Sequence, residues 1–449
     1  MKKKICFVTL GCAKNTVYSE YMMGLVADSN YSLVQDPAEA NVIVVNTCGF
    51  ITAAKEETIN TILELNDFKE NGQCEYLVAI GCMVQKYASE MEAALPELDL
   101  LLGSTAYDTI LAHIDSLYKK EQNELEKSSI DTHWHLPNVI ERNGRVLSTP
   151  GYYAYLTIAE GCDNRCTFCA IPEMQGPYRS RTMEDILEEA NMLASRDVKE
   201  VIVIAQDITT YGIDNYGRFA LPELLHALCE ISDLEWIRLL YAYPNHLSDE
   251  LIDVIAQEEK VCKYIDMPLQ HADDGILRAM NRKIDQAQIR CLISKMRERI
   301  PGLMIRSTFI VGFPGETEEA YGNLLNFLEE MKLDRVGVFP YSQEENTPAG
   351  RMPDQLDENL KEERAQNLMD VQFDIMFDKH RKLIGESRRV LIDDIEDGML
   401  LCRSYSEAPD IDPYIIVPIE EVSDYEIGQM LDVIIKKSQQ GVLIGSLAE

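Results

Sequence analysis

The sequence predicts an α/β protein of three parts: an N-terminal parallel α/β domain, a partial (β/α)6 barrel of the TIM type, and a small antiparallel β-barrel. Short apolar runs alternate with helical patterns near the N-terminus, which is typical of a parallel sheet covered by helices. Six more strand–helix units follow, and the chain ends in five short strands without helices. We therefore expect an α/β domain at 1–120, a linker at 121–147, the partial barrel at 148–380 and the β-barrel at 381–449.

The first domain is predicted from three continuous apolar runs, ICFVTL, NVIVVN and YLVAIG. Runs without polar alternation suit strands that are buried on both faces of a parallel sheet. Helical patterns at 19–27, 53–65 and 87–95 follow these runs. Residues 121–147 are polar and show no pattern of core residues, so we expect a linker there.

The second part is predicted from β-rich runs that are each followed by a helical pattern. The expected strands are 152–159, 201–205, 236–241, 263–267, 304–311 and 335–339. One helix is expected to begin at Met183, because Thr182 can cap its first turn. Six units fall short of the eight of a complete TIM barrel, so the barrel is partial. A long charged helix at 355–383 precedes the five short strands, which predict a small closed barrel.

The charge of the chain restricts its partners. Among 449 residues, 76 Asp and Glu outnumber 42 Lys and Arg, which gives a net charge of −34. Such an acidic surface repels nucleic acids and anionic lipids and favours a basic partner. The first apolar stretch is shorter than the ~7–15 residues of a signal core, which favours a strand over a lipoprotein signal ending at Cys12. We expect a cytoplasmic protein without a membrane span, because no apolar run approaches ~20 residues.

One cysteine motif carries the strongest chemical signal. Twelve cysteines in a large acidic chain without an export signal do not suggest a disulfide framework. Cys162, Cys166 and Cys169, in GCDNRCTFC, have the spacing C-x3-C-x2-C. They follow the first barrel strand, at the end where barrel enzymes place their active sites. Three thiolates can ligate three irons of a [4Fe-4S] cluster and leave the fourth iron open to a substrate.

A structural zinc site is the alternative for these three thiols. Such a site would need a fourth ligand. The nearest candidates, His133 and His135, lie in the polar linker. The missing fourth ligand therefore favours an iron–sulfur cluster over zinc.

Three further cysteines share one context, because Cys12, Cys48 and Cys82 each come just after a predicted strand. The C-terminal ends of parallel strands lie on one edge of a sheet, where ligands of open α/β sheets bind, so these thiols can converge there. The spacing leaves two interpretations open: a second thiolate cluster or three unrelated buried cysteines. The remaining cysteines are expected to be small buried hydrophobic residues, and they are Cys6, Cys74, Cys229, Cys262, Cys291 and Cys402.

The central motif, with Phe168 before its last cysteine, resembles the radical S-adenosylmethionine (SAM) superfamily. The resemblance implies that the open iron chelates SAM, that one electron cleaves SAM to a 5′-deoxyadenosyl radical, and that Phe168 lies near the adenine. It also implies SAM contacts from two segments on the rim of the barrel. Gln206 and Asp207 follow the strand VIVIA, and Gly312 and Gly315 lie in FIVGFPGET, where glycine permits a close backbone approach to a ligand.

Four other polar residues near the rim have both a functional and a structural interpretation. Gln270 and His271, in MPLQHADD, could touch SAM or the substrate, or they could serve only to hold the loop. Arg179 and Arg181 follow the cysteine motif and could neutralise a cluster or bind a carboxylate. Their alternative role is a solvated start of the next helix.

The three parts together resemble the methylthiotransferase family, whose members end in a β-barrel called TRAM. The resemblance covers nearly the whole chain and implies that Cys12, Cys48 and Cys82 bind a second [4Fe-4S] cluster, which handles the sulfur to be inserted. One branch of the family modifies an adenosine of transfer RNA, and the other modifies an aspartate of small-subunit ribosomal protein S12. LGCAKNTVYSE and EAPDID resemble the second branch, except at Ala13, where proline is expected.

The charge of the C-terminal part gives an independent argument for the substrate. From Lys382 onward the chain has six Lys or Arg and fourteen Asp or Glu. A barrel that binds RNA should present a basic face, whereas an acidic barrel suits a basic ribosomal protein. We therefore expect a radical SAM methylthiotransferase that adds a methylthio group to the β-carbon of the S12 aspartate. A transfer RNA adenosine methylthiotransferase and a non-catalytic iron–sulfur scaffold or sensor are the alternatives, and the sequence identifies neither an electron donor nor a sulfur donor.

Overall fold

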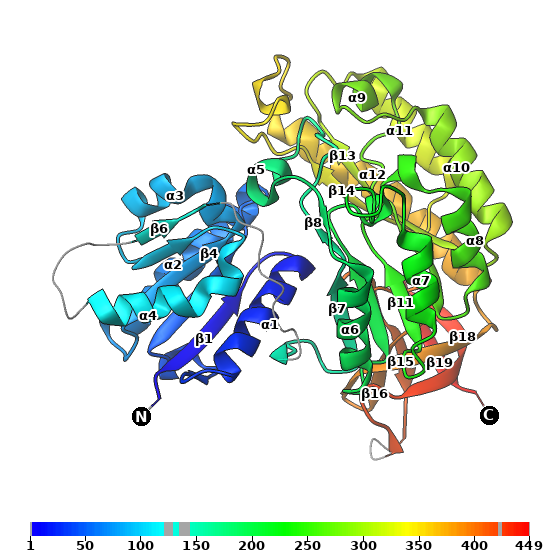
Figure 1. The fold of residues 1–449 in the computed structure, drawn as a ribbon. Coiled ribbons are helices and arrows are strands. Elements are labelled where there is room, and N and C mark those ends of the chain that lie inside the picture. The colour runs from blue at the N-terminus through cyan, green and yellow to red at the C-terminus, as the bar shows by residue number, and fades with distance from the viewer. Residues whose placement is uncertain (1, 121–128, 134–143, 421–423, 449) are drawn as a thin grey trace. The chain divides into compact units, whose positions relative to one another are not determined.

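The computed structural model describes residues 2–120, 129–133, 144–420 and 424–448. The chain divides into two units (Figure 1). The first unit is Met1–Ser148 with Glu160–Asp163 and Cys169–Arg179, and the second is Thr149–Ala159, Asn164–Phe168 and Ser180–Glu449. Within the described ranges, no helix combines the length and the hydropathy needed to span a bilayer.

The first unit is built on a six-stranded parallel sheet. In pairing order its strands are β2 (Ser32–Leu33), β1 (Lys4–Thr9), β3 (Val42–Thr47), β4 (Tyr76–Gly81), β5 (Leu100–Leu102) and β6 (Ser129–Asp131). Its longer helices are α1 (Ala13–Ala27), α2 (Thr52–Glu70), α3 (Cys82–Ala94) and α4 (Ile110–Lys120). Every residue of β3 and β4 is buried, which confirms strands covered on both faces. The helices α1 and α3 begin earlier than predicted, at Ala13 and Cys82 rather than at positions 19 and 87.

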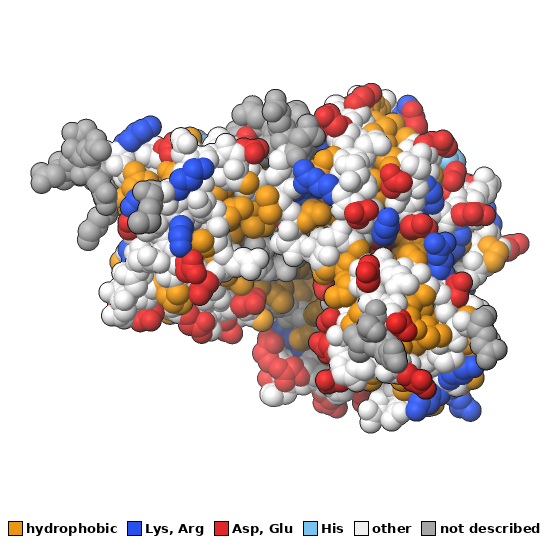
Figure 2. All heavy atoms as spheres, turned by 90° about the horizontal axis from the view of Figure 1, so that it is seen from below, with side chains coloured by type: hydrophobic (Ala, Val, Ile, Leu, Met, Phe, Trp, Pro, Cys, Tyr) orange, Lys and Arg blue, Asp and Glu red, His pale blue; other side chains and the backbone are white. Residues whose placement is uncertain are grey.

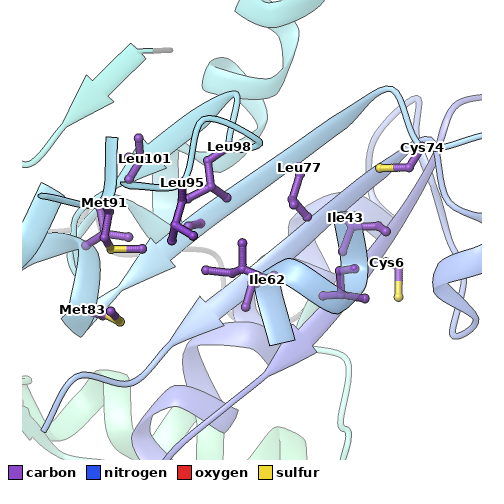
Figure 3. Packing of buried hydrophobic residues seen from close by; sticks show 14 of the residues in the cluster. Cys6, Ile43, Ile62, Cys74, Leu77, Met83, Met91, Leu95, Leu98 and Leu101 are labelled. Atoms are coloured by element: carbon purple, nitrogen blue, oxygen red, sulfur yellow. The ribbon is translucent and has the colours of Figure 1, made fainter. Parts of the chain in front are cut away.

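One of the two buried faces of this sheet is shown in Figure 3, where β1, β3, β4 and β5 face α2 and α3. Cys6 and Cys74 belong to this core, as expected, and burial raises the pKa of the Cys6 thiol to about 11. Cys262 and Cys402 are also buried, and Cys229 is half-buried. The prediction is wrong for Cys291, which is exposed on the polar face of an amphipathic helix.

The stretch at 121–147, predicted to be a linker, contains two parts of the first unit. Ser129–Asp131 form β6, which pairs in parallel with β5 at the edge of the sheet. Arg145 is buried, and its Nε donates a hydrogen bond of 2.8 Å to Glu20 of α1. The linker interpretation is therefore wrong at these positions, because a short edge strand is stabilised by backbone hydrogen bonds and needs no apolar run. His133 is exposed beside Asp131, and His135 lies outside the described residues.

The second unit contains the predicted partial barrel as a sheet of six parallel strands. In pairing order they are β14 (Arg335–Pro340), β13 (Met304–Val311), β12 (Val261–Asp266), β11 (Trp236–Leu239), β10 (Glu200–Ile204) and β7 (Tyr153–Thr157). The helices are α6 (Met183–Ala194), α7 (Leu221–Cys229), α8 (Asp249–Gln257), α9 (Asp274–Ala279), α10 (Gln286–Arg299), α11 (Glu318–Met331) and α12 (Glu358–Lys382). Thr182 caps α6 as expected, because its side chain accepts a hydrogen bond from the Asp185 amide.

The five C-terminal strands close into a barrel in the order β15 (Ser387–Glu396), β16 (Met399–Arg403), β17 (Ile415–Pro418), β19 (Val442–Leu447) and β18 (Met430–Gln439). Four of the five pairings are antiparallel, and β17 pairs with β19 in parallel. A ring with an odd number of strands cannot alternate in direction throughout, so one parallel pair is unavoidable. The small closed barrel is confirmed with this one exception to the antiparallel pattern.

The loop between β16 and β17, residues 404–414, meets the N-terminal ends of the parallel strands, and we call it the floor loop. Just before it, Arg403 Nη1 lies 2.8 Å from Glu200 Oε2 of β10, and both side chains are fully buried. Within it, Asp412 accepts a hydrogen bond of 2.7 Å from the Tyr264 hydroxyl of β12. Arg238 of β11 donates one of 2.7 Å to a carbonyl oxygen of the loop. Buried charged groups thus join the small barrel to the parallel sheet.

Candidate iron–sulfur sites

The first predicted cysteine set lies at one edge of the first sheet. The strands β1, β3 and β4 are neighbours, and their residues Thr9, Asn46 and Ile80 lie in one pairing row. Cys48 and Cys82 each follow this row by two residues, and Cys12 follows it by three. The three cysteines therefore leave the C-terminal ends of three adjacent parallel strands, as the sequence predicted.

Local contacts show how tightly these thiols are placed, and we call Cys12, Cys48 and Cys82 the strand-end trio. Gly11 has a φ of +92°, and a side chain there would come within 2.9 Å of Cys48 Sγ. Burial, followed by the charge of Cys12, raises the pKa of the Cys82 thiol to about 12. Gln175 Nε2 donates a hydrogen bond of 3.1 Å to Cys82 Sγ. Burial and the neighbouring cysteines thus oppose ionisation of the Cys48 and Cys82 thiols, and the pKa of each is raised.

Two buried asparagines support the trio, and the sequence analysis missed both. Asn15 Nδ2 donates to the carbonyl oxygens of Leu10 and Thr47, at 2.7 and 3.2 Å, at the ends of β1 and β3. Asn46 Nδ2 donates to the carbonyl oxygen of Asn15 at 2.9 Å. These bonds fix the loops that carry Cys12 and Cys48. An asparagine whose side chain donates hydrogen bonds to main-chain oxygens follows no recognisable spacing in the sequence. Only the structure therefore identifies the pair.

The chemistry of the trio fits an iron–sulfur cluster. All three thiols are free of disulfides. A metal centre would favour the thiolate forms of Cys48 and Cys82, which burial and the neighbouring cysteines otherwise oppose. No group of three or more His, Cys, Asp or Glu side chains that could hold a metal ion is found in the described part of the chain. A four-iron cluster differs from a single ion, because its own bridging sulfides fill the space between the thiolates.

The second cysteine set lies in the loop that follows β7, bracketed in the sequence by β8 (Ala159–Glu160) and by α5 (Ile171–Gln175) with β9 (Arg179–Ser180). All three of its thiols are half-buried, and none forms a disulfide. In the first unit, the Cys162 amide donates to the carbonyl oxygen of Gly176 at 3.1 Å. In the second unit, Arg282 Nη1 lies 3.6 Å from Cys166 Sγ. Cys169 belongs to the first unit and precedes α5, the helix that ends in Gln175.

Phe168 contributes to an apolar cluster of the second unit. It packs, partly buried, against a group that includes Met280, Phe313 and Tyr341. The rings of Phe313 and Tyr341 meet edge to face, with centroids 5.3 Å apart. Phe313 belongs to the FIVGFPGET segment, so the aromatic residue of the cysteine motif and this rim segment share one apolar wall.

The two residues predicted after strand β10 have different environments. Gln206 Oε1 is buried and accepts no hydrogen bond from the described residues. Asp207 is occupied instead, since its Oδ1 accepts from the Thr209 amide at 2.9 Å and its Oδ2 from Asn164 Nδ2 at 2.8 Å. Asn164 lies between Cys162 and Cys166, so Asp207 holds the cysteine loop. Gln206 is the residue that presents an unused acceptor.

Gly312 and Gly315 both have positive φ, at +73° and +79°, but only Gly312 is crowded. A Cβ at Gly312 would lie 2.2 Å from Lys361 Cγ, whereas a Cβ at Gly315 would meet nothing within 4 Å. The close neighbour of Gly312 is therefore α12 of the protein itself. Gly315 faces open space.

We expect Gly312→Ala to lower the free energy of unfolding by about 3 kcal/mol, because a left-handed residue costs ~1–2 kcal/mol and overpacking costs ~1–3 kcal/mol more. Gly315→Ala carries only the first cost, so about 1 kcal/mol is expected. Urea unfolding of the two variants measures the difference. Equal losses would contradict the role assigned to Lys361.

Glu316 organises the same rim segment, and the sequence analysis missed it. Its carboxylate accepts from the Gly312 amide at 3.0 Å, from Arg364 Nη1 at 2.6 Å and from His271 Nε2 at 3.1 Å. His271 Nδ1 accepts from the Asp273 amide at 2.9 Å, so its proton is on Nε2. His271 therefore has a structural role, whereas Gln270 has a φ of +74° and a buried Oε1 without a donor in the described residues.

The two arginines after the cysteine motif are paired with carboxylates. Arg179 Nη2 lies 3.2 Å from Glu160 Oε2. Arg181 Nε lies 2.7 Å from Asp185 Oδ2, and its Nη1 lies 2.6 Å from Glu189 Oε2. The charge of each guanidinium is thus already balanced by the protein. This pairing favours the structural interpretation of both arginines.

Three family models match successive parts of the chain. Residues 156–328 match the family described as the radical SAM superfamily, residues 4–103 match "Uncharacterized protein family UPF0004", and residues 384–447 match the TRAM domain. The structure of the radical SAM methyltransferase TsrM from Kitasatospora setae, solved with cobalamin and a [4Fe-4S] cluster, has a TM-score of 0.54 at 15% identity. That likeness covers 78% of this chain and 74% of TsrM, and it shows a shared fold.

Relatives of known name are similar over nearly the full length. The "Ribosomal protein uS12 methylthiotransferase RimO" of Lachnoclostridium phytofermentans is 45% identical over 445 residues, which are 99% of each chain. The protein of the same name from Heliobacterium modesticaldum is 48% identical over 92% of this chain and 88% of its own. Together with the matching parallel barrel and the C-terminal β-barrel, this similarity places the chain in the RimO family of radical SAM methylthiotransferases.

Proposed function

We propose that this chain adds a methylthio group to the β-carbon of an aspartate in ribosomal protein uS12. The observation that carries the proposal is the similarity, 45% over 99% of both chains, to a protein named for that activity. Its domain order supports the proposal, because the whole length from the strand-end trio to the C-terminal barrel is matched. A cytoplasmic location follows from the proposed ribosomal target and from the use of reduced thiols.

Six cysteines are proposed to hold two clusters. Cys162, Cys166 and Cys169 would hold the cluster that binds SAM, and Cys12, Cys48 and Cys82 would hold the second. When bound, these groups would pass one electron from an external reductant to SAM, generate the radical and hold the sulfur to be transferred, since cofactors carry the hard chemistry and the protein orients them. The chain itself provides thiolates at the ends of parallel strands, and Asn15 and Asn46 keep two of their loops in place.

The rim residues are proposed to orient SAM and to exclude water. Phe168 and Phe313 would form an apolar wall beside the adenine. Gln206 Oε1 would accept a hydrogen bond from SAM, because it is buried without a donor of its own. Gly315 would leave room for the ligand. Asp207 would act indirectly: it accepts a hydrogen bond from Asn164 and so holds the cysteine loop in place.

The acidic surface supports a basic protein as the substrate. Figure 2 shows one face of the molecule, on which acidic side chains lie spread among apolar and basic ones. The net charge of −34 would attract a basic ribosomal protein and repel transfer RNA. Charge therefore favours uS12 over the nucleic acid substrate of the sister branch.

Anaerobic turnover of the reconstituted chain tests the proposal. The reaction contains SAM, a reductant, purified uS12 and bulk transfer RNA, and mass spectrometry locates the methylthio group. We expect it on an aspartate of uS12. Modification of transfer RNA would overturn the substrate assignment, and the absence of 5′-deoxyadenosine would favour a non-catalytic scaffold.

A further inference from the structure

The end of α9 holds the middle of the cysteine loop through three hydrogen bonds within the second unit. The Thr167 amide donates to the carbonyl oxygen of Met280 at 3.1 Å, and the Thr167 hydroxyl donates to that of Ala279 at 2.8 Å. Asn281 Nδ2 donates to the carbonyl oxygen of Arg165 at 2.9 Å. Residues on both sides of Cys166 are thus fixed to residues 279–281. The next residue along the chain is Arg282.

Arg282 is a buried guanidinium with a defined orientation. The residue is only 6% exposed to solvent. Nη2 donates to the carbonyl oxygen of Pro268 at 2.6 Å, and the guanidinium carbon lies 4.1 Å from the ring centroid of Tyr243. Nη1 points at Cys166, 3.6 Å from its sulfur. The carbonyl and the aromatic face together aim the cation at the thiol.

The charge of Arg282 is not balanced by the described part of the protein. No carboxylate there forms an ion pair with it, and its buried Nε has no hydrogen-bond acceptor. Arg179 and Arg181 differ, because each is paired with a carboxylate. A buried cation without a counter-charge is costly. A thiolate at Cys166 and the sulfides of a cluster would supply both the missing negative charge and the missing acceptor.

We propose that Arg282 is the cationic donor to Cys166 and that it raises the reduction potential of the SAM-binding cluster. The inference rests on the proposed function, because it takes the cluster at Cys162, Cys166 and Cys169 as given. A cluster gains negative charge when it is reduced, so a cation held beside one of its ligands stabilises the reduced form. Net charge and hydrogen bonds to sulfur are the means by which proteins set such potentials. Arg282 is thus a positioning residue: it acts through Cys166 and makes reduction of the cluster more favourable.

An electron paramagnetic resonance titration of the cluster against potential tests this role. The full chain is used with Cys12, Cys48 and Cys82 replaced by alanine, so that only the SAM-binding cluster contributes a signal. We expect Arg282→Met to reduce the ratio of reduced to oxidised cluster at least tenfold at a fixed potential. For one electron this is a midpoint about 59 mV more negative. Arg282→Lys keeps the positive charge, so we expect its midpoint potential to shift by less than half of the shift seen for Arg282→Met.

Arg290→Met is the matched control, because Arg290 also lies over an aromatic ring, that of Phe327, but pairs with Glu330 instead of a cysteine. The midpoint potential of the cluster in Arg290→Met should equal that of the single-cluster chain that keeps both arginines. If Arg282→Met, with full iron content, titrates like the control, the inference is wrong. Should Arg282→Met assemble no cluster, Arg282→Gln carries the same expectation, and an unchanged potential for it overturns the inference.

The two levels of the proposal fail in different ways. If the single-cluster chain binds no iron, or if its signal survives Cys166→Ala, the cluster assignment itself is wrong. If the signal depends on Cys166 but not on Arg282, the cluster assignment stands and only the role of Arg282 is lost.

Discussion

Replacement of Cys166 by alanine is expected to abolish the reductive cleavage of SAM. The substitution removes one of three thiolates proposed to hold the SAM-binding cluster, and it leaves Arg282 beside an empty position. We expect the rate of 5′-deoxyadenosine formation to fall at least about a thousandfold, which corresponds to ~4 kcal/mol in the barrier. Iron bound per chain should fall from about eight to about four atoms, since a [4Fe-4S] cluster needs its thiolates. Chromatography of the anaerobic reaction and iron analysis measure these changes.

Cys291→Ala is the control for this prediction, because Cys291 is an exposed cysteine of α10 in the same unit as Cys166. It should retain both its iron and its SAM cleavage. Cleavage of SAM by purified, reconstituted Cys166→Ala at the rate of this control would refute the ligand assignment.

Replacement of Cys48 by alanine should separate the two halves of the reaction. Cys48 belongs to the strand-end trio and not to the motif proposed to bind SAM. We expect 5′-deoxyadenosine to form at a rate within about threefold of the unmodified chain, a difference of ~0.7 kcal/mol. The methylthio product on uS12 should be lost completely. Both products can be followed in one reaction, by chromatography of the nucleoside and mass spectrometry of the protein.

Cys74→Ala provides a matched control on the same sheet. Cys74 precedes β4, whereas Cys82 follows it, so the two cysteines lie at opposite ends of one strand. Loss of the buried Cys74 side chain should cost ~1 kcal/mol of stability, with the methylthio product retained. Full product formation by Cys48→Ala would rule out a catalytic second cluster, and loss of product in Cys74→Ala would show that the assay reports stability alone.

The sequence predicted the strands because their apolar runs are continuous, and it predicted the strand-end trio from the strands. Parallel strands bring their C-terminal ends to one edge, so the placement of Cys12, Cys48 and Cys82 follows from topology. The same logic failed for β6, since Ser129–Asp131 is short, polar and stabilised by backbone bonds. The parallel pair of β17 and β19 was also missed, although closure of five strands requires one such pair.

Residues that act through space could not be predicted from spacing. Arg282 is 116 positions from Cys166, and no local pattern joins the two. Glu316 also has no local signal, because its partners His271 and Arg364 lie 45 and 48 positions away in the sequence. The glycines there were predicted for their freedom toward a ligand, but Gly312 is needed to accommodate Lys361. Gln206 and Asp207 are adjacent in the sequence, and only the fold shows how they differ. Gln206 Oε1 is buried without a hydrogen-bond donor, whereas the Asp207 carboxylate accepts a hydrogen bond from Asn164.

The floor loop has a consequence for chimeric proteins. Arg238 gives two hydrogen bonds to carbonyl oxygens of this loop, and the buried Arg403 pairs with Glu200. A chain cut before residue 384 would leave the arginine of β11 and the glutamate of β10 short of partners that are more than 160 positions away. The C-terminal barrel therefore cannot be replaced on its own by the barrel of a relative. We expect such an exchange to succeed only when β10 and β11, which carry Glu200 and Arg238, come from the same relative.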